Sequence, residues 1–256
     1  MDRVLNGQSR DWWNTAALAL LAVIVFFLIW LSACSSGAAN KAGNNQAATN
    51  TSNATGPPAT TSQANTSDQS VPTSLANAGE YGENIYDYAK ANDWKNAGVK
   101  LAALKDAAGK VRAEVKNKSA AVDRLDGQVA ALDRAVAAKD RQATMREANQ
   151  ITLDVANMTA AYKLNVPVNV VKLDYYGREL EVWAQAQDGT KLQATAADMR
   201  RTWDSLRPSI QAHSATEARK FETLVAQVES AKTSADYARA ATPVLNEVDN
   251  LEKLFP

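Results

Sequence analysis

The chain has 256 residues, and its 28 Lys and Arg balance 28 Asp and Glu, so the formal net charge is zero. A neutral balance without a run of like charge argues against a nucleic-acid surface or a polybasic membrane patch. One cysteine and one histidine provide neither a disulfide nor the ligand spacing of a transition-metal site. We therefore expect no nucleic-acid partner, no metal and no cofactor.

An apolar run of 16 residues, Ala16 to Leu31, lies near the start of the sequence. As a helix rising ~1.5 Å per residue it would span roughly 24 Å, which is short of the ~30 Å hydrocarbon core of a bilayer. This length is typical of an export signal or of a short membrane anchor. Lys41 is the only charged residue between Trp12 and Ser67, so the charge bias predicts that the remainder is exported.

The apolar run ends in Leu31-Ser32-Ala33-Cys34, which resembles the lipobox of bacterial lipoproteins. The resemblance implies cleavage before Cys34 and a lipid on that cysteine. The alternative is an uncleaved transmembrane helix with an incidental cysteine. In either case residues 1–33 are predicted to be a signal peptide or an N-terminal anchor, and the bilayer is a partner through Cys34 or the 16–31 segment. The rest of the chain is then extracytoplasmic, on the periplasmic or cell-surface side of a bacterial membrane.

Residues 34–78 are rich in Ala, Asn, Ser and Thr and contain almost no large apolar side chains. Burial of so little apolar surface cannot offset the entropy cost of ordering the backbone. We interpret the segment as a disordered tether.

A pattern that recurs four times follows the tether. Four aspartates are separated by 47, 48 and 48 positions: Asp93, Asp140, Asp188 and Asp236. Apolar residues stand eight positions before each: Ile85, Leu132, Leu180 and Val228. After the first three aspartates, apolar residues recur at offsets of 11, 15, 18 and 22, which is the stripe of an amphipathic helix: Leu104, Ala108, Val111 and Val115; Ile151, Val155, Met158 and Tyr162; Met199, Trp203, Leu206 and Ile210. Each unit is predicted to be a helical hairpin with its aspartate at the turn, where the carboxylate caps a helix.

The sequence therefore predicts an all-α fold of eight helices in four hairpins, with a period of about 48 residues. The predicted helices are 79–91, 94–117, 119–139, 141–164, 168–187, 190–212, 215–234 and 237–255. Tyr81-Gly82 recurs as Tyr176-Gly177, 95 positions later, which indicates a duplicated four-helix unit. We expect two tandem up-down four-helix bundles, residues 79–164 and 168–256, with a short α-solenoid as the alternative.

Three features depart from ideal helices. Gly98 and Gly109 lie inside a predicted helix, where each costs about 1 kcal/mol against alanine, and close helix contact is the expected compensation. Pro243 indicates that the last helix begins at Thr242 or is kinked. Glu247 stands where the other units have Leu, Ile or Met.

The richest candidate for a specific surface is the segment from Leu173 to Trp183, together with Trp203 of the next helix. Its candidate binding residues are Tyr175, Tyr176, Arg178, Trp183 and Trp203, because aromatic side chains around a charged group can line a ligand groove or anchor a partner. In the alternative, the aromatic residues fill the core and Asp174–Arg178 is an exposed ion pair at i,i+4 spacing.

The sequence contains no local catalytic motif and no glycine-rich phosphate loop. We expect a non-catalytic, membrane-tethered helical lipoprotein that acts as a binding or scaffold module for an envelope protein or a small ligand. The alternative is a small-ligand receptor that uses the aromatic surface of the second bundle.

Overall fold

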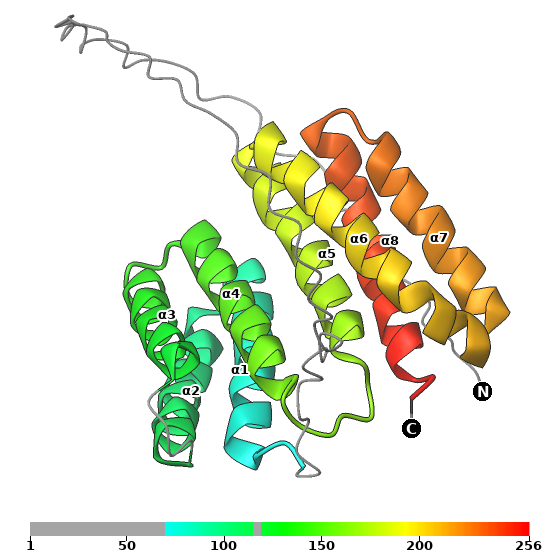
Figure 1. Cartoon of the computed structure of the whole chain (residues 1–256). Helices are drawn as coiled ribbons and strands as arrows, with labels where there is room; N and C mark the ends of the chain where they lie inside the picture. Colours follow the sequence, from blue (N-terminus) through cyan, green and yellow to red (C-terminus); the bar gives the residue numbers. More distant parts are fainter. Residues whose placement is uncertain (1–69, 115–118, 256) are drawn as a thin grey trace, which may run out of the picture. The chain divides into compact units, whose positions relative to one another are not determined.

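The computed structural model describes residues 70–114 and 119–255, and within them the chain is all-α (Figure 1). It forms eight helices in chain order: α1 (Thr73–Lys90), α2 (Trp94–Glu114), α3 (Ala120–Ala137), α4 (Arg141–Thr159), α5 (Val168–Ala186), α6 (Gly189–His213), α7 (Ala215–Ser230) and α8 (Ser234–Glu252). The described residues contain no strand; one isolated bridge joins Ser70 and Lys163. The predicted fold class and the number of helices are confirmed.

Most helix boundaries agree with the predicted ones to within a few residues, and the largest shifts are at the start of the first helix and the end of the fourth. The first helix begins at Thr73 rather than at residue 79, directly after Pro72, whose missing N–H costs nothing at a helix start. The fourth ends at Thr159 rather than at residue 164. Pro243 lies inside α8, so that helix does not begin at Thr242.

The predicted signal peptide or anchor, Cys34 and residues 34–69 of the predicted tether lie outside the described residues. Within the described part of the chain, no helix has both the length and the hydropathy that crossing a membrane requires.

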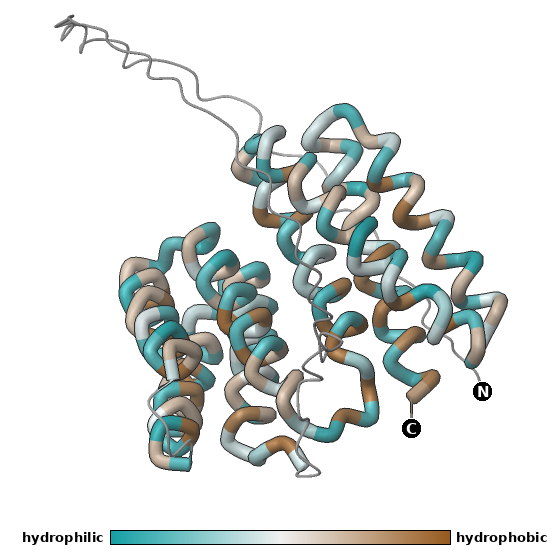
Figure 2. Tube along the Cα trace, viewed as in Figure 1, coloured by the Kyte–Doolittle hydropathy of each residue, from teal (hydrophilic) through white to brown (hydrophobic). Residues whose placement is uncertain are grey.

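The recurring apolar stripe forms the core, and Figure 2 shows apolar and polar residues alternating along the helices. The four residues that precede the aspartates by eight positions are each 0% exposed: Ile85, Leu132, Leu180 and Val228. The stripe residues after the aspartates are buried as well, except that Met158 and Tyr162 are partly buried and Val115 is not described. The predicted core is confirmed for the described residues.

The turns between the paired helices explain why aspartate recurs. Asp93, Asp140 and Asp188 each accept a hydrogen bond from the backbone N–H three residues later, at 3.1, 3.0 and 3.0 Å, and thereby cap α2, α4 and α6. The residue before each aspartate has a left-handed backbone that closes the preceding helix: Asn92, Lys139 and Gln187, with φ of 57°, 51° and 56°. The same short turn is therefore built three times.

The fourth turn differs. Helix α8 begins at Ser234, three residues before the predicted start, and Thr233 is its N-cap. Asp236 is the third helical residue and accepts from the Thr233 N–H at 2.9 Å, so that the two residues form a capping box. Asp236 thus keeps a capping role but lies inside the helix rather than at the turn.

Each half of the described chain has its own helix neighbours and its own core. Helices α1 and α3 each contact α2 and α4, while α5 and α7 each contact α6 and α8. Two buried apolar clusters largely follow this division, except that Val182 of α5 belongs to the cluster of the first half, and α4 and α5 are in contact across it. The Tyr-Gly pairs mark equivalent positions, because the missing side chains of Gly82 and Gly177 face α4 and α8, respectively.

The expected compensation at Gly98 and Gly109 is wrong. A Cβ added to either would meet no atom within 4 Å, so neither glycine serves a helix contact. The close approaches are at Gly82, where a Cβ would lie 3.2 Å from the Ala148 carbonyl oxygen, and at Gly177, where it would lie 2.6 Å from Leu245 Cδ2.

Candidate functional site

The aromatic residues predicted to form a binding surface divide between two environments. Trp203 is 0% exposed, its ring centroid lies 4.8 Å from that of Phe221, and its Nε1 donates to the Glu222 carboxylate at 2.7 Å. Tyr176 packs partly buried against the same core. Trp203 is therefore a core residue of the second half, and Tyr176 and Trp183 pack against the same cluster.

Arg178 and Asp174 form the predicted ion pair, with 3.1 Å between Arg178 Nε and Asp174 Oδ2. The expectation that the pair is exposed is wrong, because the two side chains are only 12% and 14% exposed. Helix α1 covers them. The guanidinium carbon of Arg178 lies 5.2 Å from the centroid of the Tyr86 ring, and Nη2 lies 3.7 Å from Glu83 Oε2.

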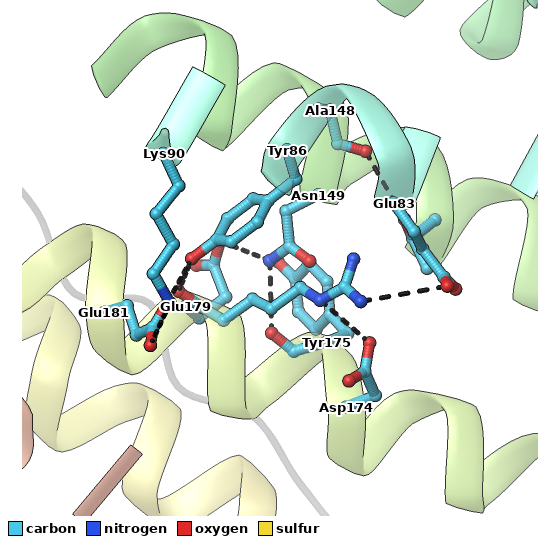
Figure 3. A network of polar contacts seen from close by, with 11 residues as sticks. Glu83, Tyr86, Lys90, Ala148, Asn149, Asp174, Tyr175, Glu179 and Glu181 are labelled. Atoms are coloured by element: carbon cyan, nitrogen blue, oxygen red, sulfur yellow. Dashed lines mark hydrogen bonds and ion pairs between the residues drawn. The ribbon is translucent and has the colours of Figure 1, made fainter. Parts of the chain in front are cut away.

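Two side chains of α1 bind one carboxylate of α5 (Figure 3). The Tyr86 hydroxyl donates to Glu181 Oε2 at 2.8 Å, and Lys90 Nζ lies 2.7 Å from both Glu181 oxygens. Tyr86 is 1% exposed and Glu181 is 8% exposed. These charge-assisted contacts join residues more than 90 positions apart and tie α1 to α5.

A second carboxylate of α5 is bound by α4 and by its own helix. Asn149 Nδ2 donates to Glu179 Oε1 at 3.2 Å and to the Tyr175 carbonyl oxygen at 3.1 Å. The indole N–H of Trp183 donates to the other oxygen of Glu179. We name Tyr86, Lys90, Asn149, Glu179 and Glu181 the polar junction, because it joins α1 and α4 to α5.

The surroundings of the junction keep the phenols of Tyr86 and of the neighbouring Tyr175 protonated. Burial, followed by the Glu181 carboxylate, raises the pKa of Tyr86 well above its ordinary value. Burial and the Glu179 carboxylate raise the pKa of Tyr175 in the same way. Tyr86 therefore remains a hydrogen-bond donor at physiological pH, as the contact with Glu181 requires.

A cavity of about 350 Å³ lies beside the junction, between α1, α4 and the start of α5. Its lining is mostly aliphatic and includes Val155, Val166 and Val171. Glu80 and Glu83 of α1 supply the carboxyl groups of this lining. We name it the Glu83 cleft. Its volume falls at the lower end of the ~300–1,000 Å³ typical of small-ligand pockets.

Glu83 is the perturbed group of the cleft. Burial raises the pKa of its carboxyl to about 7, and the carboxylates of Asp174, Glu252 and Asp87 act in the same direction, while Arg178 opposes them. The side chain nevertheless keeps 39% of its surface exposed. A carboxyl whose pKa is raised by burial and which opens to an apolar cleft is a candidate for a functional site.

Of the predicted site residues, the structure brings Tyr175, Arg178 and Trp183 to the junction, and Tyr176 and Trp203 to the core of the second half. Trp183 also packs against both buried clusters. Sequence reasoning missed Glu83 and the whole of the polar junction. One signal was present: Glu179 and Glu181 flank the core residue Leu180 on both sides. All three residues are buried. Consecutive residues point to different sides of a helix, so their burial means that α5 is covered on more than one face.

Among the described residues, no group of three or more His, Cys, Asp or Glu side chains is placed to hold a metal ion. Comparison with protein-family models, with curated proteins and with solved structures found no match.

Proposed function

We propose that this chain is a non-catalytic, membrane-tethered, extracytoplasmic lipoprotein whose helical part acts as a binding or scaffold module. The tether rests on the Leu31-Ser32-Ala33-Cys34 motif, on the apolar 16–31 segment and on the charge bias around it. The bilayer is then one partner, and an envelope protein or a small ligand is the other.

The Glu83 cleft carries the binding part of the proposal. It combines an apolar wall with a carboxyl group whose pKa burial raises, and its lining comes from α1, α4, α5 and the segments that precede α1 and α5. The polar junction holds together α1, α4 and α5, the three helices that line the Glu83 cleft. Because both carboxylates of the junction are engaged by donors from other side chains, their role is to position helices rather than to transfer protons.

We infer further that the helices form two tandem up-down four-helix bundles. In each half the first helix contacts the fourth as well as the second, so that the four helices close on one core. In an α-solenoid each hairpin would instead stack on the next, and the first and fourth helices of a half would be further apart.

The tether is tested by metabolic labelling of the full chain with a palmitate analogue in a bacterial host. Wild type should incorporate the label and Cys34→Ala should not. Met145→Leu serves as a matched control, since it changes a buried residue of the helical part and leaves the motif intact. Equal labelling of wild type and Cys34→Ala would contradict the lipoprotein assignment.

The second candidate function is a small-ligand receptor, and the presence of a cleft of about 350 Å³ favours it. No aromatic side chain of the predicted surface lines this cavity, and Trp203 is fully buried elsewhere. Ligand-induced changes should therefore depend on Glu83 and on Val166 at the cleft wall. Thermal-shift measurements on Val166→Asp and Trp203→Phe against a metabolite panel separate the two locations.

A further inference from the structure

The wall of the Glu83 cleft favours a hydrocarbon group. Val155 of α4, Val171 of α5 and Val166 of the connecting segment face it from different parts of the chain. Gly79 contributes the absence of a side chain, since a Cβ there would lie 3.1 Å from Val155 Cγ1. An apolar group that enters this space removes aliphatic surface from water, which favours binding.

The charges around the cleft favour a cation. Of the charged groups with the largest effect on the pKa of Glu83, Arg178 is a cation, whereas Asp174, Glu252 and Asp87 are anions. These groups come from α1, α5 and α8, and Glu80 adds another carboxylate to the lining. Arg178 lies 3.1 Å from Asp174 and 3.7 Å from Glu83, so one cation is shared between two carboxylates, and the negative charge around Glu83 is only partly compensated.

We propose that the Glu83 cleft binds a small amphiphilic amine, with the ammonium group at the Glu83 carboxylate and the hydrocarbon part against Val155, Val166 and Val171. The assignment rests on the proposed binding function and names the ligand class of the same site. An anionic amphiphile would place its charge beside Glu80 and Glu83, which costs free energy in a partly desolvated site.

Binding of a cation should be linked to pH. An ammonium group favours the ionised form of Glu83, so that binding releases a proton whenever the carboxyl was protonated beforehand. With a pKa of about 7 in the free protein, the ionised fraction of Glu83 rises about tenfold between pH 6 and pH 8. The amine itself stays protonated throughout, because alkylammonium groups titrate near 10.4.

The test is isothermal titration of the full chain, held in phosphatidylcholine nanodiscs, with n-hexylamine, hexan-1-ol and hexanoate, after subtraction of titrations into empty nanodiscs. Hexylamine should bind at least about tenfold more tightly than the other two compounds, which corresponds to one charge-assisted contact. Its Kd should fall about tenfold from pH 6 to pH 8.

Two variants isolate the carboxylate. Glu83→Gln keeps the shape of the side chain and should weaken hexylamine binding at least about tenfold and abolish the pH dependence. Asp133→Asn removes one carboxylate from an exposed ion pair with Lys105 on α2 and α3, and should bind as wild type does. Circular dichroism melts show whether each variant is folded, and the pH dependence of wild type tests the proposal independently of them.

Hexan-1-ol binding as tight as hexylamine, a Kd for hexylamine that does not change with pH, or no hexylamine binding at all would each overturn the assignment. The labelling experiment on Cys34 and the hexylamine titration test the lipid tether and the ligand class separately. If Cys34 is not labelled while hexylamine binds, the lipoprotein proposal fails and the ligand class stands. If Cys34 is labelled while hexylamine does not bind, the ligand class fails and the tether stands.

Discussion

Replacing glycine by alanine at helix-interior positions should have opposite effects at two kinds of site. At Gly98 and Gly109 a Cβ meets no atom within 4 Å, so alanine contributes its helix propensity and stabilises the fold by about 1 kcal/mol. At Gly82 the same Cβ would lie 3.2 Å from the Ala148 carbonyl oxygen and 3.3 Å from Ile151 Cγ2.

The Gly82 site has little room to relax, because its closest neighbour belongs to the α4 backbone. Overpacking a tight contact costs about 1–3 kcal/mol, which cancels or exceeds the gain in propensity. We therefore expect Gly82→Ala to leave the free energy of unfolding unchanged or to lower it by up to about 2 kcal/mol. The contrast with Gly98→Ala, about 1–3 kcal/mol, is the quantity to measure.

Urea unfolding of the full chain, followed by circular dichroism at the helix band, provides this comparison. Gly98→Ala is the matched control, since both glycines lie inside helices of the same half and differ in what faces them. If Gly82→Ala stabilises the chain as much as Gly98→Ala does, α1 and α4 do not approach closely at this point and the reasoning fails.

Three further predictions concern the core, the junction and one misplaced charge. Leu180→Ala should lower the free energy of unfolding by about 2–5 kcal/mol because Leu180 is 0% exposed, whereas Val99→Ala, at a residue 62% exposed, should change it little in the same urea melt. Tyr86→Phe should lower the free energy of unfolding by about 1.5–3 kcal/mol, because the hydrogen bond to the Glu181 carboxylate is lost. In a double-mutant cycle, Tyr86→Phe combined with Glu181→Gln should cost less than the sum of the two single changes, whereas additive effects would contradict the contact. Glu247→Leu should stabilise by about 1–3 kcal/mol at neutral pH, since burial raises the pKa of this carboxyl and one of its oxygens lacks a hydrogen-bond donor; a lower melting temperature would refute this.

The core was predictable because it depends on local periodicity. Leu132, Leu180 and Val228 occupy equivalent places before a turn, and each is fully buried as the spacing requires. Asp93, Asp140 and Asp188 were predictable for the same reason, since a cap involves neighbours in the sequence.

The site was not predictable in this way, because it depends on contacts between distant segments. Tyr86 meets Glu181 across 95 positions, and no local pattern indicates that α1 covers this face of α5. The ion pair of Asp174 and Arg178 was correctly paired from its i,i+4 spacing, but its burial depends on α1.

The glycines show the same limit. Gly82 and Gly98 both stand in helices, and sequence alone assigns each the same cost. Gly82 faces α4 in the folded chain, whereas Gly98 faces no neighbouring atom, and this difference depends on how the helices pack. Repetition of the Tyr-Gly pair was the more informative signal, because both of its glycines lie at close contacts.

The acid–base behaviour of Glu83 also affects stability. Its pKa is raised in the folded chain, so the folded state holds this proton more tightly than the unfolded state does. The contribution of Glu83 to the free energy of unfolding should therefore fall as the pH rises from about 4.5 to about 7. Glu83→Gln should remove this part of the pH dependence.

The most direct test of the cleft is the titration of Glu83 itself, followed by the ¹³C chemical shift of its carboxyl carbon in the full chain, with Glu83→Gln to assign the signal. The arrangement of burial and carboxylates predicts a midpoint near pH 7. A midpoint near 4.5, the ordinary value for a glutamate, would contradict the account of this site.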